Sequence, residues 1–114
     1  MTSTERLPVA VDAMGGDKAP AEIVAGSIRA RDELGVSVVL VGRPEELTDV
    51  GGLEVLPASE VIAMDADPGK SVRTMKDSSL VRAAEAVRDG KACAMVSAGN
   101  TGATMGSALL HHFI

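Results

Sequence analysis

The stretch VSVVLVG, residues 36–42, is the strongest strand signal in the chain, because a continuous and mostly β-branched run ends at a glycine. A helical pattern precedes it. Apolar residues recur at helical spacing over residues 20–34, with Pro20 in the first turn and Gly35 just past the last one. This order, a helix and then a strand, is the first sign of an alternating α/β chain.

The alternation extends in both directions from this stretch. Residues 7–13 form a short apolar run that is too continuous for a half-exposed strand and predicts a buried parallel one. Residues 59–64 are ambiguous between the two patterns. Along the rest of the chain we predict, in order, a short helix, a weaker strand, a loop, a helix, a buried strand and a further helix, over residues 43–47, 53–59, 65–71, 79–89, 92–98 and 101–111.

Strands that alternate with helices at this spacing imply right-handed crossovers and a parallel sheet flanked by helices. We therefore predict the fold class α/β, in three layers. A length of 114 residues allows one domain and is too short for two ordinary ones, so residues 1–114 are taken as one unit. The sequence ends in ALLHHFI, an apolar helix without a cap or a polar tail, and we expect the chain to be the N-terminal part of a longer α/β domain.

The composition argues against several classes of function. The net charge is −5 and Phe113 is the only aromatic residue, so a nucleic-acid partner is not expected. Cys93 is the only cysteine and lies in an apolar run, which predicts a buried thiol in a reducing compartment. Residues 1–8 lack the features of a signal peptide, and glycines interrupt the uncharged stretch 92–114. We expect a cytoplasmic protein.

The first polar loop, VDAMGGDKAP at residues 11–20, follows the first predicted strand. Asp12 ends that strand, and Gly15–Gly16 allows a positive φ and a close approach of a ligand to the backbone. Asp17 and Lys18 flank the start of a helix, whose free amide groups attract anions. A tight turn in which Asp17 merely caps the helix explains this loop equally well.

The second polar loop, SAGNTGAT at residues 97–104, lies between the last predicted strand and the last predicted helix. Its two glycines expose backbone amides, and hydroxyl and amide side chains surround them. Such donors at a helix N-terminus suit a phosphate or a developing oxyanion. Helix capping needs only one polar residue, whereas this loop has four, so we favour an anion site. Its polar residues are Ser97, Asn100, Thr101 and Thr104, and they surround Gly99 and Gly102.

The third polar segment, SVRTMKDSSL, precedes the helix predicted over residues 79–89. Arg73 and Lys76 are three residues apart, so they can share a helix face or a loop rim, and cations beside hydroxyls describe an anion site. Taken alone, a solvated basic patch with a capping Asp77 or Ser78 is the better explanation. The residues that follow the two cations are Asp77, Ser78 and Ser79.

No nucleotide-binding or metal-binding motif is present. The chain has neither GxGxxG nor a P-loop, and its histidines have no cysteine or carboxylate at the spacing of a metal site. We therefore predict no cofactor and no metal.

Taken together and in this order, VDAMGGDKAP, MKDSS and VSAGNTGA resemble the bacterial phosphate acyltransferase family of phospholipid synthesis. The similarity runs from about Val9 to Leu110 and includes VLVGRPEEL and VIAMDADPGKSVR. The chain departs from the family pattern at two positions. Lys18 stands where the family has histidine, and Met75 stands where the family tends to have a lysine.

The resemblance implies a Rossmann-like α/β/α sandwich, similar to phosphotransacetylases and isocitrate-dehydrogenase-like enzymes, that acts as a homodimer without a cofactor. The implied reaction moves a fatty acyl group from acyl carrier protein to inorganic phosphate and gives an acyl phosphate. Lys76 and Asn100 are then the catalytic candidates, Lys76 for phosphate and Asn100 for the oxyanion or phosphate. The implied binding set is Asp12, Gly15, Gly16, Asp17, Lys18, Arg73, Asp77, Ser78, Ser79, Ser97, Gly99, Thr101 and Gly102.

Acyl carrier proteins are acidic, so a basic docking patch is expected. Arg82 and Arg88 are candidates for it, although a solvated helix face explains these two arginines better. The resemblance also implies a cytoplasmic enzyme that associates peripherally with the inner face of the plasma membrane. Two alternatives stay open: a phosphotransacetylase-like enzyme that uses acyl-CoA, and, for this chain alone, a non-catalytic anion-binding or assembly module. We expect little activity from the isolated chain, and we expect the loops at Gly15 and Gly99 at the same end of one sheet.

Overall fold

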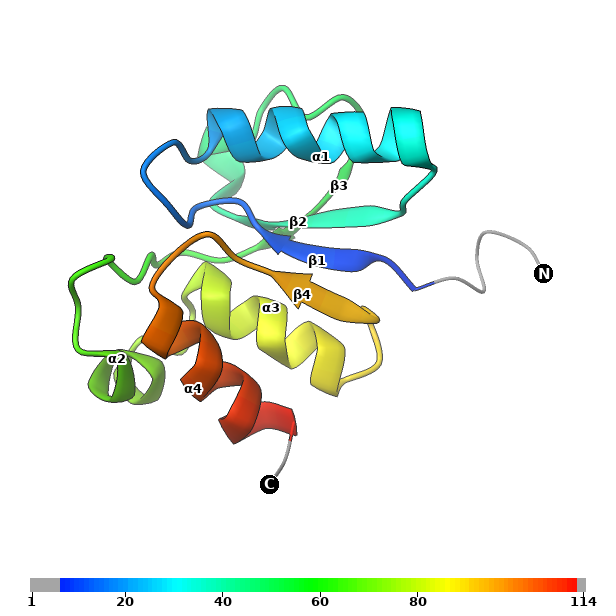
Figure 1. Cartoon of the computed structure of the whole chain (residues 1–114). Helices are drawn as coiled ribbons and strands as arrows, with labels where there is room; N and C mark the ends of the chain where they lie inside the picture. The colour runs from blue at the N-terminus through cyan, green and yellow to red at the C-terminus, as the bar shows by residue number, and fades with distance from the viewer. Residues whose placement is uncertain (1–6, 113–114) are drawn as a thin grey trace.

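The computed structural model describes residues 7–112 and contains one sheet of four parallel strands (Figure 1). The sheet order is β3-β2-β1-β4. In the register of the sheet, Val11 lies opposite Leu40 on one side and Val96 on the other. The strands are β1 (Val9–Asp12), β2 (Val38–Gly42), β3 (Glu54–Pro57) and β4 (Ala94–Val96).

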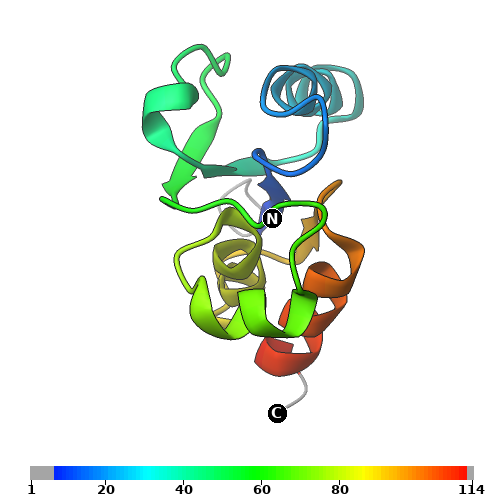
Figure 2. The ribbon, with the colours of Figure 1, turned by 90° about the vertical axis from the view of Figure 1, so that its left-hand side faces the viewer.

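Helices cover both faces of the sheet, which confirms the predicted α/β class. α1 lies on one face, and α2, α3 and α4 lie on the other, so that the sheet is the middle of three layers (Figures 1 and 2). Among the described helices, none combines the length and the apolar character needed to cross a bilayer. The helices are α1 (Ala21–Leu34), α2 (Pro68–Thr74), α3 (Ser79–Arg88) and α4 (Thr101–His112), with a single 3₁₀ turn, η2 (Pro44–Glu46).

The continuous apolar run of β2 is explained by its place between two layers. Successive side chains of a strand point to opposite faces. Val39 and Val41 belong to the core on the α3 side, and Val38 and Leu40 belong to the core on the α1 side. All five residues of β2 are buried. A strand with no solvent-facing side has no place for a polar alternation, and this is why its pattern is unbroken.

Local signals set the ends of α1 and α3 as predicted. Gly35 follows α1 with φ of 69° and donates its amide to the carbonyl of Arg31 at 3.1 Å. This left-handed conformation favours glycine and satisfies a carbonyl of the last turn. The Ser78 hydroxyl caps α3 by accepting from the Val81 amide at 3.2 Å, and Gly90, with φ of 77°, follows its end.

Two sequence predictions are wrong. The predicted loop over residues 65–71 contains the start of α2, because the Asp67 carboxylate accepts from the Lys70 amide and Pro68 occupies the first helical position. The predicted burial of β4 and of Cys93 also fails, since Val96 is 55% exposed and Cys93 is exposed. Within the described residues β4 pairs with β1 alone, and its face toward α1 is only partly covered.

The strand order reverses next to β1. The chain runs outward from β1 to β2 and β3, and then returns past β1 to form β4 on its other side. In open parallel sheets, ligands bind at the carboxyl ends of the strands, at the point where the order reverses. Figure 2 looks onto this end of the molecule, where the loops that follow β1 and β4 meet. The fold therefore directs attention to the segment after Asp12 and the segment after Val96.

Candidate functional site

Asp12 is the centre of the junction between the loops. Its carboxylate is 2% exposed, and it joins three segments that are far apart in the sequence. Oδ1 accepts from the Ser79 hydroxyl at 2.5 Å and from the Met14 amide at 3.1 Å, and Oδ2 accepts from the Ser97 hydroxyl at 2.8 Å. The start of α3 and the loop after β4 are thus fixed to the end of β1.

The backbones of the two glycine loops touch each other beside Asp12. A Cβ atom at Gly15 would lie 2.6 Å from Asp12 Oδ2 and 2.9 Å from the Gly99 amide nitrogen. Gly16 has φ of 97°, and a Cβ atom there would lie 3.0 Å from the Ala98 carbonyl oxygen. Both contacts require glycine. The prediction that the loops at Gly15 and Gly99 lie at the same end of one sheet is confirmed.

Asn100 is buried, and both ends of its amide are engaged. Oδ1 accepts from the Ala103 amide at 3.0 Å and so caps α4. Nδ2 donates toward the carbonyl oxygens of Ala63, Met64 and Ala66, at 3.1, 3.2 and 3.0 Å. In this conformation the side chain holds the segment before α2 and points no hydrogen at a ligand. Its predicted role as a donor to reacting oxygen stays a prediction.

The predicted cations and Asp17 lie at the surface. Lys18 and Asp17 are exposed before α1, and Arg73 and Lys76 are exposed on α2 and just after it. Within residues 7–112, the side chains of Arg73 and Lys76 make no hydrogen bond or ion pair. Thr101 is exposed at the first position of α4. These side chains are available to a ligand, whereas Ser78 is buried as the cap of α3.

Residues 7–112 match the family described as "Fatty acid synthesis protein". The chain belongs to this family. It is 47% identical over 112 residues to the phosphate acyltransferase of Nostoc punctiforme, covering 92% of the chain and 33% of that relative. It is 47% identical over 113 residues to the phosphate acyltransferase of Heliobacterium modesticaldum, covering 91% of the chain and 34% of the relative.

The chain spans about a third of the length of these phosphate acyltransferases. The match to the fatty acid synthesis protein family includes all three polar segments singled out in the sequence. Two of these segments touch each other where Gly15 packs against Gly99. The third is tied to the first by the hydrogen bond from the Ser79 hydroxyl to Asp12.

The arginines considered for acyl carrier protein docking are paired with carboxylates. Arg82 Nε lies 2.7 Å from Asp77 Oδ1, and its NH1 lies 2.9 Å from Glu85 Oε1. Arg88 pairs with Asp89 at 2.9 Å and approaches Glu85. The outer face of α3 therefore carries interleaved charges of both signs, and it does not form a basic patch.

Asp77 belongs to a separate cluster at the end of β3. The Ser59 hydroxyl donates to Asp77 Oδ2 at 2.5 Å, and Arg82 binds its other oxygen. This hydroxyl contact, and then Arg82, hold the pKa of the Asp77 carboxyl below its usual value. A hollow of about 450 Å³ lies beside them, lined by Pro44, Glu45, Leu56, Pro57, Ala58, Ser59, Asp77 and Arg82. Local sequence gave no signal for Ser59, because Asp77 lies 18 residues further on.

The lowered pKa predicts a pH dependence for Asp77→Asn. A carboxyl whose pKa is depressed by folding contributes stability above its unfolded pKa of about 3.9, and that contribution is lost as the pH falls through the folded value. We expect the variant to melt roughly 2–4 °C below the parent chain at pH 7, because the pair is exposed and its effect is modest. The difference should shrink as the pH falls below about 4, the ordinary range of an aspartate carboxyl, because the folded pKa of Asp77 lies below that value. Thermal melts at pH 7, 5 and 3 measure it.

The matched control for this experiment is Asp49→Asn, since Asp49 is exposed and makes no ion pair with another described residue. Its melting temperature should follow the parent chain at every pH. A difference for Asp77→Asn that stays constant from pH 7 to pH 3 contradicts the assignment.

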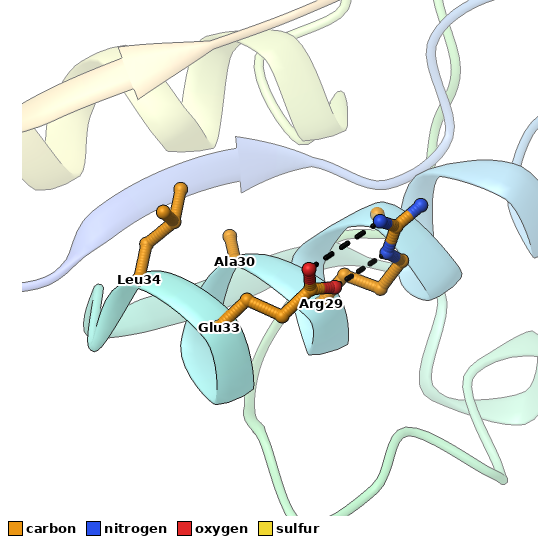
Figure 3. A pocket seen from close by; sticks show the side chains of 5 residues that line it. Arg29, Ala30, Glu33 and Leu34 are labelled. Carbon is orange, nitrogen blue, oxygen red and sulfur yellow. Dashed lines mark hydrogen bonds and ion pairs between the residues drawn. The ribbon is translucent and has the colours of Figure 1, made fainter.

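A second hollow lies on α1, away from the glycine loops (Figure 3). It measures about 300 Å³ and is bounded by Gly26, Arg29, Ala30, Glu33 and Leu34. Arg29 Nε and Glu33 Oε2 are 2.6 Å apart, so the two charges satisfy each other. Nothing in this hollow adds to the site at the carboxyl end of the sheet. Within residues 7–112, His, Cys, Asp and Glu side chains nowhere gather in a group of three that could hold a metal ion.

Proposed function

We propose that this chain forms part of the active site of an enzyme that transfers a fatty acyl group from acyl carrier protein to inorganic phosphate. The observation that supports it is the contact of two glycine loops around Asp12, at the reversal of strand order, in a chain whose relatives are named phosphate acyltransferases. The product is an acyl phosphate for phospholipid synthesis.

The reaction needs positioning and charge stabilisation. A phosphate oxygen attacks the thioester carbonyl carbon, a carbon–oxygen bond forms, the carbon–sulfur bond breaks, and the thiolate leaves and takes up a proton. Phosphate is already an anion near neutral pH, so the site must mainly hold it against the carbonyl and stabilise the tetrahedral oxyanion.

We assign these tasks to groups that the fold leaves available. Lys76 and Arg73 hold phosphate, because they are exposed cations without a partner among the described residues. The first amides of α4, at Thr101 and Gly102, have no carbonyl of their own helix to bind and face the phosphate or the oxyanion. Asp12, with the hydroxyls of Ser79 and Ser97, fixes the junction without reacting.

The remaining predicted residues form the rim of the site. The loop with Gly15, Gly16, Asp17 and Lys18 makes one wall, with Gly99 packed against it. Asp77 contributes to the rim by accepting hydrogen bonds from Ser59 and Arg82. The reaction requires no cofactor.

The partners follow from the same proposal. Because Arg82 and Arg88 are paired with carboxylates, acyl carrier protein docks on basic groups other than these two arginines. The full enzyme is a cytoplasmic homodimer that associates peripherally with the inner face of the plasma membrane. The isolated chain is inactive, because part of a cleft cannot exclude water or hold two substrates.

A chimera tests the proposed function. This chain replaces the corresponding N-terminal third of the Nostoc punctiforme relative, and the chimera is incubated with phosphate and either acyl carrier protein thioester or acyl-CoA. Acyl phosphate is trapped with hydroxylamine and counted only above a reaction without phosphate, because thioesters also react with hydroxylamine. We expect product from the carrier-protein donor. Lys76→Ala should raise the phosphate concentration needed by about 10- to 100-fold, because a charged hydrogen bond is lost.

The matched control is Lys91→Ala. Lys91 is an exposed lysine near the amino end of β4, at the opposite end of the sheet, and its loss should leave the kinetics unchanged. No product from either donor by a folded chimera would overturn the proposal. If the chimera prefers acyl-CoA, the proposed acyl donor is wrong and acyl-CoA takes its place.

A further inference from the structure

We infer that Asn100 is a positioning residue that holds the cation-bearing segment 63–74 against α4, and that it does not donate to the reacting oxygen. Nδ2 lies 3.0–3.2 Å from the carbonyl oxygens of Ala63, Met64 and Ala66. An amide nitrogen has two hydrogens. Three acceptors already share them, so none is left for a substrate.

Apart from Asn100, the segment is fixed by the Ala66 amide, which donates to the Ala63 carbonyl at 3.1 Å, and by the packing of Ala66 and Val72 in one apolar cluster. Its first part, residues 63–67, lies between the isolated bridge of Glu60 with Ser78 and the start of α2, and this part contains neither helix nor strand. Three of its carbonyl oxygens accept from Nδ2 of Asn100, a residue that is only 4% exposed. Removal of Nδ2 leaves these carbonyls without this donor and releases the turn.

A second contact shows that α2 and the start of α4 act as one unit. A Cβ atom at Gly102 would lie 2.6 Å from Pro68 Cγ, so the first residue of α2 packs directly on the first turn of α4. Val72 of α2 and Ala103 of α4 are buried in the same apolar cluster. Together with the three hydrogen bonds of Asn100, this packing sets the distance between the cation Arg73 on α2 and the free amides at the start of α4.

The kinetic consequence rests on the proposed function. If Arg73 in this segment and Lys76 just after it bind phosphate, loosening of the segment weakens phosphate binding and leaves the reacting groups intact. The phosphate KM should rise about tenfold, and kcat at saturating phosphate should stay within about threefold. A donor to the oxyanion behaves differently, since its loss lowers kcat by about 10²–10³.

Two variants separate the capping of α4 by the Asn100 oxygen from the holding of residues 63–74 by its nitrogen. Asn100→Ser and Asn100→Asp both keep a side-chain oxygen for the N-cap of α4, and both lose the Nδ2 hydrogens. Hydrogen exchange of the isolated chain is measured by mass spectrometry. We expect exchange over residues 63–75 to become about tenfold faster in both variants, while peptides from β1 and β2 keep their parental rates. Kinetics are then measured on the same variants in the chimera.

The outcomes are distinct. Unchanged exchange over residues 63–75, or equally faster exchange along the whole chain, overturns the holding role. A loss of kcat of about 10² or more with an unchanged phosphate KM restores the donor role and also overturns the inference. If the unsubstituted chimera makes no acyl phosphate, the proposed function fails, whereas faster exchange confined to residues 63–75 still supports Asn100 as the residue that holds this segment.

Discussion

Replacement of Asp12 by alanine is expected to lower the free energy of unfolding by about 3 kcal/mol, because three donors lose a buried charged acceptor. The Ser79 hydroxyl and the Met14 amide stay buried and lose this partner, and the loop after β4 loses its tie to β1. Urea unfolding of the isolated chain, followed by circular dichroism, measures the effect. In the chimera, the rate of acyl phosphate formation should also fall, because the junction no longer has a fixed shape.

The conservative variant Asp12→Asn should lose only about 1–2 kcal/mol, since its carbonyl oxygen still accepts and its amide can donate to a serine hydroxyl. The matched control is Asp49→Ala at an exposed position, with an expected change within about 0.5 kcal/mol. Equal effects of Asp12→Ala and Asp49→Ala would show that the junction does not contribute to stability.

Gly15→Ala is expected to destabilise the chain by about 2–3 kcal/mol, because the added Cβ meets atoms that cannot move aside cheaply. It would lie 2.9 Å from the Gly99 amide nitrogen, which is backbone, and 2.6 Å from Asp12 Oδ2, which is already held by Ser97. The two loops must separate to accept it. The same unfolding measurement reports the loss, and the variant chimera should show weaker phosphate binding.

Gly26→Ala is the matched control for this change. Gly26 lies inside α1, and a Cβ atom there would meet nothing within 4 Å. Alanine should stabilise this helix by about 0.5–1 kcal/mol, because glycine has the greater backbone freedom to lose. If Gly15→Ala is as stable as Gly26→Ala, the close approach of the two glycine loops does not exist in solution.

The elements defined by neighbouring residues were the ones that the sequence could predict. The ends of α1 depend on Pro20 and Gly35, and β2 follows from one apolar run. β4 was placed correctly, but its burial was not. Burial depends on what covers the strand, and within the described residues only β1 pairs with it. Cys93 was misjudged for the same reason.

The site was predictable as a set of loops but not as a set of contacts. Parallel topology alone brought Gly15 and Gly99 to one end of the sheet. By contrast, Asp12 reaches Ser79 across 67 residues and Ser97 across 85, and no local pattern encodes such pairs. In the sequence, Asn100 is one of several polar residues near glycine. In the fold, its amide binds the segment before α2, which lies 34–37 residues earlier in the chain.

The position of β4 beside β1 has a consequence for the order of folding. β1, β2 and β3 are joined by short connections, whereas the pairing that brings Ser97 to Asp12 closes a loop of 85 residues. Long closures cost more chain entropy and slow the search for native contacts. We therefore expect β1, β2 and β3 to assemble first and β4 with α4 to dock last. Any partly folded form that stops before this docking has β1, β2 and β3 paired but lacks β4 and the glycine junction.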